Sequence, residues 1–225
     1  MDRSSLLPEK VFKAGYAVIH LGKGRHAFFK GVDKVYHPFE KIETEIAWPY
    51  QASLLNPANS SESYALSIVN NQRILHHFLF EKDKELCDVE IIKRPKTYFP
   101  HRTKTDLFYT IGGISVELDK VQMEIDLTLE YCGKVGIFEA KNGKPKDFAI
   151  YQLYHPFLMY KQIAEKPEFQ NVKEIVGVYM VATKDRKTRE NLYKFWQYTF
   201  EVATEMTSIR LLKAATYRLV TPPTP

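Results

Sequence analysis

The chain has 225 residues, which is enough for one sizeable hydrophobic core or for one large domain with a small appendage. Its 44% hydrophobic and 26% charged residues are typical of a soluble globular protein and exclude disorder over most of the chain. The net charge of +5 is mild, and it fits either a lysine-rich surface or a polyanionic partner such as nucleic acid.

The two cysteines, Cys87 and Cys132, lie far apart and have no CxxC or histidine pattern around them, so we expect neither a disulfide framework nor a structural zinc. No apolar run approaches the ~18 residues that cross a bilayer, and the opening MDRSSLLPEK lacks the apolar core of a signal peptide. The sequence therefore predicts a soluble cytoplasmic protein with no membrane partner and no organic cofactor.

The N-terminal segment, residues 1–58, is expected to be an accessory unit that contributes DNA contacts. A short helix around PEKVFK precedes YAVIHL, the glycine-flanked turn GKGR and HAFF, a pattern typical of a β-hairpin. Lys23 and Arg25 in this basic turn are candidates for contacts with DNA phosphates. The alternative is that the hairpin is a solvated edge of the main fold. The proline-containing stretch 35–55 is expected to be a connector.

A helix is expected from about residue 60 to 81, where apolar residues recur at helical spacing. The run Asn59-Ser60-Ser61-Glu62 is a typical helix start, with an acid three positions after the first capping candidate. Glu62 would lie in the first turn, where a carboxylate also has a plain structural role at the positive end of the helix dipole. The polar stretch KRPKTYFPHRTKT should separate this helix from the strands that follow.

Four strands are expected next, in DLFYTI, GISVEL, VQMEIDLTLEY and VGIFEAK, with Cys132-Gly133 as a two-residue turn between the last two. A helix should follow from Asp147, and Pro156 inside it should kink or split it. EIVGVYMVAT is apolar throughout, which is typical of a strand covered on both faces. The spacing of apolar residues predicts a helix over 188–206, and SIRLLKAATYRLV predicts a final strand.

The order of these elements predicts an α/β fold in which a mixed central β-sheet carries helices on both faces. Residues 59–225 would form this core together with a short C-terminal tail, TPPTP, which is expected to be extended. The helix and the basic hairpin would be a small N-terminal appendage to it.

The stretch GIFEAKNGK places Glu139 and Lys141 at the end of an apolar strand. With the two-residue turn placed as above, Asp126 faces Glu139 on the neighbouring strand, and Glu124 faces Lys141. Opposed side chains lie roughly 5 Å apart, so the two facing carboxylates repel unless a cation lies between them. Oxygen ligands with open positions suit Mg²⁺. A surface ladder of salt bridges is the alternative, which the apolar flanks disfavour.

The segment EIDLTLEYCGKVGIFEAKNGK, with a helix before it that starts on an acid and a helix after it that carries Gln152, resembles the PD-(D/E)XK nuclease superfamily. Within that superfamily it is most similar to type II restriction endonucleases, over about residues 59–183. Ile125 stands where the first acid is often preceded by proline. Gln152 and Tyr160 resemble the Gln and Tyr that follow the catalytic lysine in the RecB-like branch, at a longer spacing, so Gln152 is a candidate catalytic residue.

The resemblance implies a restriction-endonuclease-like fold and a Mg²⁺-dependent phosphodiesterase that leaves a 5′-phosphate by in-line displacement. Asp126, Glu139 and the carbonyl of Ala140 would hold the metal. Glu62 matches an accessory acidic ligand only loosely. Lys141 would orient the attacking water and help to deprotonate it.

Lys144 and Lys146, just past this strand, are further candidates for contacts with DNA phosphates, with a solvated loop as the alternative. The histidines His76, His77 and His155 have no partners at metal or triad spacing and are expected to be surface or core residues.

The sequence thus predicts an endonuclease of the restriction type that acts on double-stranded DNA. Recognition of a palindromic site would require a two-fold homodimer, because the symmetry of the protein then matches that of the site. Two alternatives remain open: a repair or defence nuclease that selects structures or ends, and a non-catalytic DNA-binding module that keeps the fold.

Overall fold

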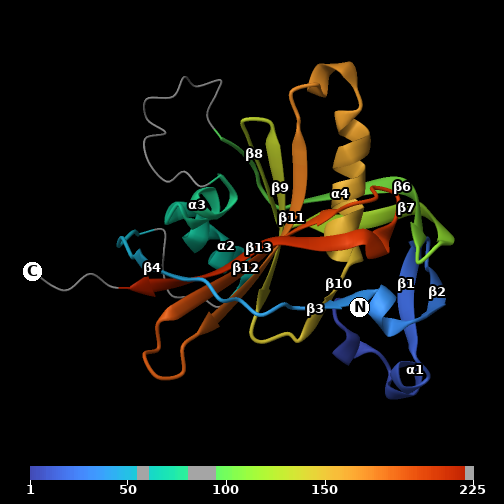
Figure 1. Cartoon of the computed structure of the whole chain (residues 1–225), viewed down its shortest axis with the longest axis horizontal. Coiled ribbons are helices and arrows are strands. Elements are labelled where there is room, and N and C mark those ends of the chain that lie inside the picture. The colour runs from blue at the N-terminus through green and yellow to red at the C-terminus, as the bar shows by residue number, and fades with distance from the viewer. Residues whose placement is uncertain (55–60, 81–94, 221–225) are drawn as a thin grey trace, which may run out of the picture.

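The computed structural model describes residues 1–54, 61–80 and 95–220. Its centre is a seven-stranded mixed sheet with the order β4-β13-β12-β11-β9-β8-β5 (Figure 1). Its strands are β4 (Glu45–Pro49), β13 (Ile209–Val220), β12 (Asn191–Phe200), β11 (Glu174–Lys184), β9 (Lys134–Asn142), β8 (Leu127–Tyr131) and β5 (Lys96–Tyr98). The pairs β9–β11 and β4–β13 are parallel and the other pairs are antiparallel. The expected α/β class with a mixed central sheet is confirmed.

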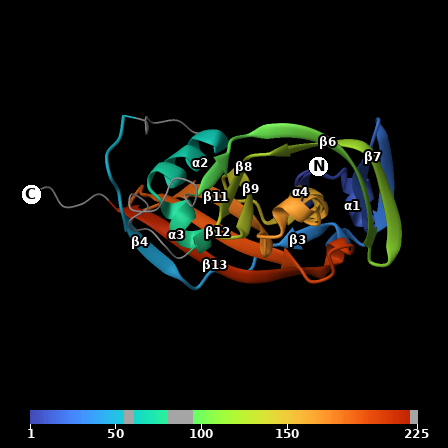
Figure 2. The same cartoon turned by 90° about the horizontal axis from the view of Figure 1, so that it is seen from above.

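Helices cover both faces of this sheet, also as expected. They are α2 (Glu62–Asn71), α3 (Ile74–Phe80) and α4 (Tyr151–Ala164). α2 and α3 lie on one side of β9 and β11, and α4 lies on the other side (Figure 2). Successive side chains of β9 alternate between the two cores: Ile137 packs in the core of α4, and Phe138 packs in the core of α2 and α3. Odd-numbered residues at the end of β9 therefore face the side of α4.

The N-terminal helix and hairpin form as expected, at one end of the molecule (Figure 1). They are α1 (Glu9–Lys13), β1 (Tyr16–Gly22) and β2 (Arg25–Lys30), next to a second long hairpin of β6 (His101–Ile111) and β7 (Ile114–Ile125). Short 3-10 turns lie at Ser4–Leu6, Val32–Lys34, Pro167–Phe169 and Met206–Ser208.

The stretch 35–55 is not a connector, which corrects the expectation. It contains β3 (Tyr36–Pro38), which pairs with β10 (Asp147–Ala149), and β4, which pairs with β13 at the edge of the main sheet. Backbone hydrogen bonds to distant strands outweigh the local proline signal here. The core of the fold therefore includes β3 and β4, which belong to the N-terminal segment 1–58.

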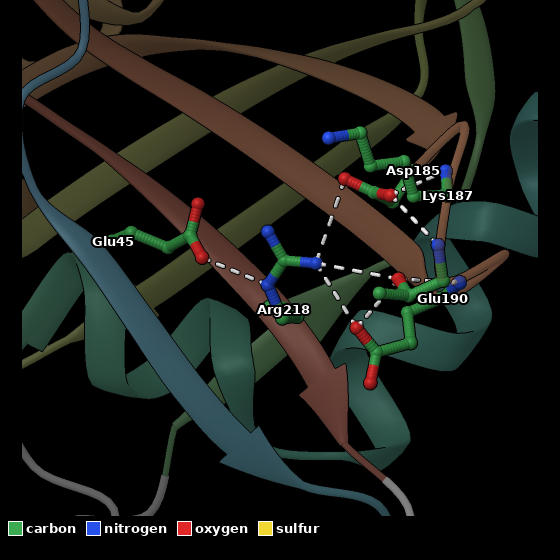
Figure 3. Close-up of polar contacts among 6 residues, drawn as sticks. Glu45, Asp185, Lys187, Glu190 and Arg218 are labelled. Atoms are coloured by element: carbon green, nitrogen blue, oxygen red, sulfur yellow. Dashed lines mark hydrogen bonds and ion pairs between the residues drawn. The ribbon is translucent and has the colours of Figure 1, made fainter.

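Arg218 of β13 links β4 to its neighbours through ion pairs (Figure 3). Its Nε donates to Glu45 Oε1 in β4 at 2.8 Å, and its Nη1 lies 3.0 Å from Glu190 Oε2 and 3.6 Å from Asp185 Oδ2. Asp185 also accepts backbone N–H groups of the β11–β12 turn. One guanidinium thus joins the edge strand, the last strand and a turn.

The helix expected over 188–206 is wrong, because residues 191–200 form β12. This strand is rich in aromatic residues and pairs with β11 on one side and β13 on the other. Pairing on both edges outweighs the helical spacing of its apolar residues. The polar stretch KRPKTYFPHRTKT likewise contributes β5 and the start of β6, because residues 96–98 pair with β8 and the residues from 101 on pair with β7.

The helix expected over 60–81 is two helices. Ser61 caps α2 by accepting the N–H of Tyr64 at 3.1 Å, and Glu62 is its first residue. Arg73 has a left-handed backbone with φ of 63° and separates α2 from α3. Asn59, Ser60, Cys87 and the TPPTP tail lie outside the described residues.

The helix expected from Asp147 begins later, at Tyr151, since residues 147–149 form β10. Pro156 does not split it, and α4 continues to Ala164. No helix in the described ranges is long and apolar enough to cross a membrane.

Candidate active site

The two-residue turn expected between β8 and β9 is present, and both of its residues have a left-handed backbone. The ladder of β8 and β9 has the expected register and ends with Leu127 opposite Phe138. Asp126 lies in a bend between β7 and β8, one residue beyond the last pair. The predicted register is therefore confirmed as far as the pair of Leu127 and Phe138, one step short of Asp126 and Glu139.

Asp126 makes a side-chain contact where the backbone ladder stops. Its Oδ2 accepts the N–H of Ala140 at 2.8 Å, which fixes the carboxylate against the end of β9. Burial raises the pKa of Asp126, and the hydrogen bond from Ala140 opposes that rise. The carboxylate is thus held in place by the same residue whose carbonyl is a candidate metal ligand.

Glu139 is buried, with 7% of its surface exposed. Its Oε1 lies 2.8 Å from Lys141 Nζ and accepts a hydrogen bond of 2.6 Å from Gln152 Nε2 of α4. Burial raises the pKa of Glu139 to about 8; the charge of Lys141 opposes this and the nearby Asp126 adds to it. The expected proximity of acid and amine is therefore present, and Gln152 joins them.

Lys141 connects the strand end to α2. Its Nζ lies 3.4 Å from Glu62 Oε2, in addition to its contact with Glu139. Burial works against the charge of Lys141, but the surrounding carboxylates outweigh it and raise its pKa. Lys141 is thus an ammonium group that lies between the carboxylates of Glu62 and Glu139.

Glu124 does not face Lys141, which corrects the expected register at this point. It lies in β7 opposite Arg102 of β6, whose Nε donates to Glu124 Oε2 at 3.2 Å. The bend at Asp126 separates β7 from β8, so the pairing of β8 with β9 does not extend back to Glu124.

The side chains of Asp126, Glu139 and Lys141 line one cavity of about 360 Å³, and we call these three residues the polar cluster. The lining of this cavity includes Glu62, Glu124, Asp126, Glu139, Lys141 and Gln152, and also Asp2, Ile19, His20, Tyr151 and His155. The last five were not predicted as site residues. Most come from distant segments, and no local pattern in the sequence marks them. Tyr151 and His155 lie in α4 beside Gln152, so these two were within reach of the sequence argument.

The three histidines are core or partly buried residues, as expected. His155 is buried and its Nε2 lies 2.8 Å from the hydroxyl of Tyr109, and burial lowers its pKa to about 3. His76 is buried in α3, where burial lowers its pKa to about 4. His77 Nδ1 lies 2.6 Å from the hydroxyl of Tyr217. His155 lines the cavity as a neutral group.

The four predicted DNA-binding residues lie outside this cavity lining. Lys144 and Lys146 are exposed in the loop directly after β9. Lys23 and Arg25 face Asp119 of β7, with nitrogen-to-oxygen distances of 2.6 Å and 4.0 Å. Lys23 and Arg25 thus lie near a carboxylate of this chain.

Tyr160 does not join Gln152. Its hydroxyl donates to Thr128 Oγ1 at 3.5 Å, in a second and largely apolar pocket of about 260 Å³. Of the two residues that resemble the RecB-like branch, Gln152 contacts Glu139 and Tyr160 does not line this cavity.

The chemistry of the donor set fits a hard divalent cation. Asp126, Glu139 and the carbonyl of Ala140 offer oxygen atoms alone, which Mg²⁺ prefers. Gln152 Oε1 is buried and has no hydrogen-bond partner in the described part of the chain. No three His, Cys, Asp or Glu side chains are arranged as a ready ligand set over the described ranges. The third protein ligand would therefore be the carbonyl rather than Glu62.

Residues 31–218 match a family described as a domain of unknown function, DUF6997. The chain belongs to the DUF6997 family. No curated protein and no solved structure matches it. The DUF6997 region contains the polar cluster around Glu139, and it begins directly after β2. The cluster is thus part of the DUF6997 domain, whereas the β1–β2 hairpin lies outside the matched residues.

Proposed function

We propose that this chain is a Mg²⁺-dependent endonuclease that hydrolyses phosphodiester bonds of double-stranded DNA. The observation that carries the proposal is the convergence of Asp126, Glu139 and Lys141 in one cavity at the end of a buried strand. A restriction-endonuclease-like fold is part of the proposal, and the mixed sheet with helices on both faces is compatible with it.

The residues have separate tasks in this proposal. Asp126, Glu139 and the Ala140 carbonyl would hold Mg²⁺, which when bound supplies an acidified water and neutralises charge on the phosphate. The ammonium group of Lys141, 2.8 Å from Glu139, would donate to the attacking water or to a phosphate oxygen beside that carboxylate. Gln152 is a positioning residue, because its amide fixes Glu139 Oε1.

The direct test is digestion of plasmid DNA with Mg²⁺ by the wild-type protein and by Lys141→Ala. We expect the variant to bind DNA and to lose at least about 100-fold in rate, the scale of losing a charged donor that stabilises the transition state. Lys134→Ala is the matched control, because Lys134 lies in the same strand and also pairs with a glutamate, Glu174, at 3.3 Å. Near-normal cutting by Lys141→Ala would refute its role. DNA binding without cutting by the wild type would favour a non-catalytic module.

The second candidate is a nuclease that selects DNA structures or ends instead of a sequence. The observation that favours it is the exposed aromatic and basic face of the β1–β2 hairpin, which begins at the cavity. Discrete bands from plasmid DNA, together with a dimer in solution, would support a restriction enzyme. A smear, or cutting limited to substrates with ends or unpaired segments, would support the second candidate.

A further inference from the structure

The outward face of the β1–β2 hairpin carries aromatic, imidazole and ammonium groups. Ala17 and Ile19 of β1 are buried, so the alternate residues of the strand point away from the core. We call the resulting surface the ribbon face; its cross-strand pairs are Tyr16 with Lys30, Val18 with Phe28, and His20 with His26. None of these six residues is acidic, so the ribbon face suits an anionic partner.

The groups of the ribbon face are arranged for contacts with aromatic rings and with anions. Phe28 is 64% exposed, so its ring is accessible to a ligand. His20 Nδ1 and His26 Nε2 lie 3.3 Å apart, so one imidazole donates to the other, and a second nitrogen of each ring lies outside this contact. Lys30 Nζ lies 4.8 Å from the centre of the Tyr16 ring.

The ribbon face is continuous with the candidate active site. His20 lines the same cavity as Glu139 and Lys141. The hairpin lies against β7 at the end of the molecule (Figure 2). At the hairpin turn, Lys23 Nζ lies 2.6 Å from Asp119 Oδ2 of β7. A polymer bound in the cavity would pass over His20 and His26 before it reaches Phe28.

The exposed ring of Phe28 distinguishes between two forms of nucleic acid. In a duplex the faces of the bases are covered by their neighbours, and only base edges are accessible in the grooves. An unpaired base offers its whole face, and stacking on an aromatic side chain is the usual way in which proteins bind single strands. The imidazole pair beside Phe28 supplies an N–H donor for a phosphate, from the ring that accepts within the pair.

We propose that the ribbon face binds an unpaired stretch of the DNA substrate where it leaves the cavity, with Phe28 stacked on a base and the His20–His26 pair contacting a phosphate. The inference rests on the proposed nuclease function and narrows its substrate to DNA with a single-stranded segment beside the cleavage site.

The test measures binding without cleavage, by fluorescence anisotropy with Ca²⁺ in place of Mg²⁺. The probes are a blunt duplex, the same duplex with a 5′ or a 3′ tail, and a single strand. We expect the wild type to prefer tailed DNA, and Phe28→Ala to lose about tenfold in affinity for tailed and single-stranded DNA, the scale of one lost stack. Affinity for the blunt duplex should change less than about twofold, and Phe28→Trp should retain tail binding.

Phe108→Ala is the matched control, because Phe108 of β6 is also 64% exposed and lies outside the ribbon face. The double variant His20→Asn, His26→Asn should bind tailed DNA more weakly, as expected when one phosphate contact is lost. Phe28→Ala binding tailed DNA like the wild type, or losing affinity equally for all probes, would overturn the inference.

The two proposals fail in different ways. If the wild type cuts DNA with Mg²⁺ and the ribbon variants bind every probe normally, the nuclease function stands and the role of the ribbon face is wrong. If the wild type neither binds nor cuts any of the probes, both proposals are wrong.

Discussion

Glu139 is the only buried carboxylate among the described residues. Its neighbours determine its charge: burial favours the protonated form, and the ammonium group of Lys141 favours the charged form. Gln152 donates to the same oxygen that faces Lys141, so the position of the carboxylate is fixed from two sides. Because its pKa is raised, the carboxyl group of Glu139 would release its proton when a metal ion binds.

The raised pKa of Glu139 predicts that divalent ions bind more tightly at higher pH. A metal ligand must be deprotonated, and Glu139 still holds its proton in part of the molecules below its pKa of about 8. Calorimetric titration with Mn²⁺ or Mg²⁺ at about pH 6.5 and about pH 8.5 should show tighter binding at the higher pH. Affinity that is independent of pH would contradict the assignment of Glu139 as a ligand.

Gln152 should influence the metal through Glu139. Removing a partner that orients a ligand typically costs about 10- to 100-fold in metal affinity, and we expect Gln152→Ala to lie in this range. Gln162→Ala is the control, since Gln162 is an exposed residue of the same helix. Metal titration of the three proteins measures the effect, and equal affinities for all of them would show that Gln152 does not position Glu139.

At the scale of elements, sequence patterns predicted those structures whose causes are local. The hairpin of β8 and β9 follows from a two-residue turn between apolar strands, and its register predicts that Asp126 and Glu139 are neighbours. β12 and β4 depend on pairing with strands far away in the chain. Glu124 was misplaced because a bend at one residue ended the ladder, and His20 joins the cavity only through the packing of a separate hairpin.

Glu205 links the tip of the β6–β7 hairpin to the loop before β13. Its carboxylate accepts hydrogen bonds from Thr110 Oγ1 at 2.7 Å, from the N–H of Gly112 at 2.9 Å, and from the N–H of Thr207 at 3.0 Å. Partial burial opposes the charge, but these bonds outweigh it and lower the pKa of Glu205 to about 2. The charged form is thus the one that stabilises this connection.

Acid should therefore weaken the fold through Glu205. Because its pKa is lower in the folded than in the unfolded state, its contribution to the free energy of unfolding is present above about pH 4.5 and is lost as the pH falls toward 2. Thermal unfolding of the wild type and of Glu205→Gln over this range checks the prediction. The difference in Tm between them should shrink as the pH falls, and a constant difference would contradict it.

At the scale of the whole molecule, segments far apart in the chain complete one sheet. Arg218 holds β4, β13 and the β11–β12 turn together through three carboxylates (Figure 3). The cavity lies elsewhere, at the end of β9 on the side of α4. The network around Arg218 is thus a test of stability that leaves the candidate active site untouched.

Arg218→Met should lower the Tm, because it leaves Glu45, Asp185 and Glu190 close together without their cation. The control is Arg210→Met in the same strand, since Arg210 pairs with the exposed Glu201 and should have the smaller effect on Tm. Differential scanning calorimetry of both variants measures this, and equal Tm values for the two would show that the network does not hold β4. DNA cleavage by Arg218→Met at temperatures well below its Tm should stay normal.

The most direct test of the proposed nuclease site is single-turnover cleavage of a labelled DNA duplex with a tail, by the wild type and by Asp126→Asn, with Mg²⁺ and with EDTA. We predict cleavage by the wild type that EDTA abolishes, and no measurable cleavage by Asp126→Asn at a Tm close to that of the wild type. Cleavage that continues in EDTA, or a folded Asp126→Asn that cuts at the wild-type rate, would contradict the assignment of this cavity.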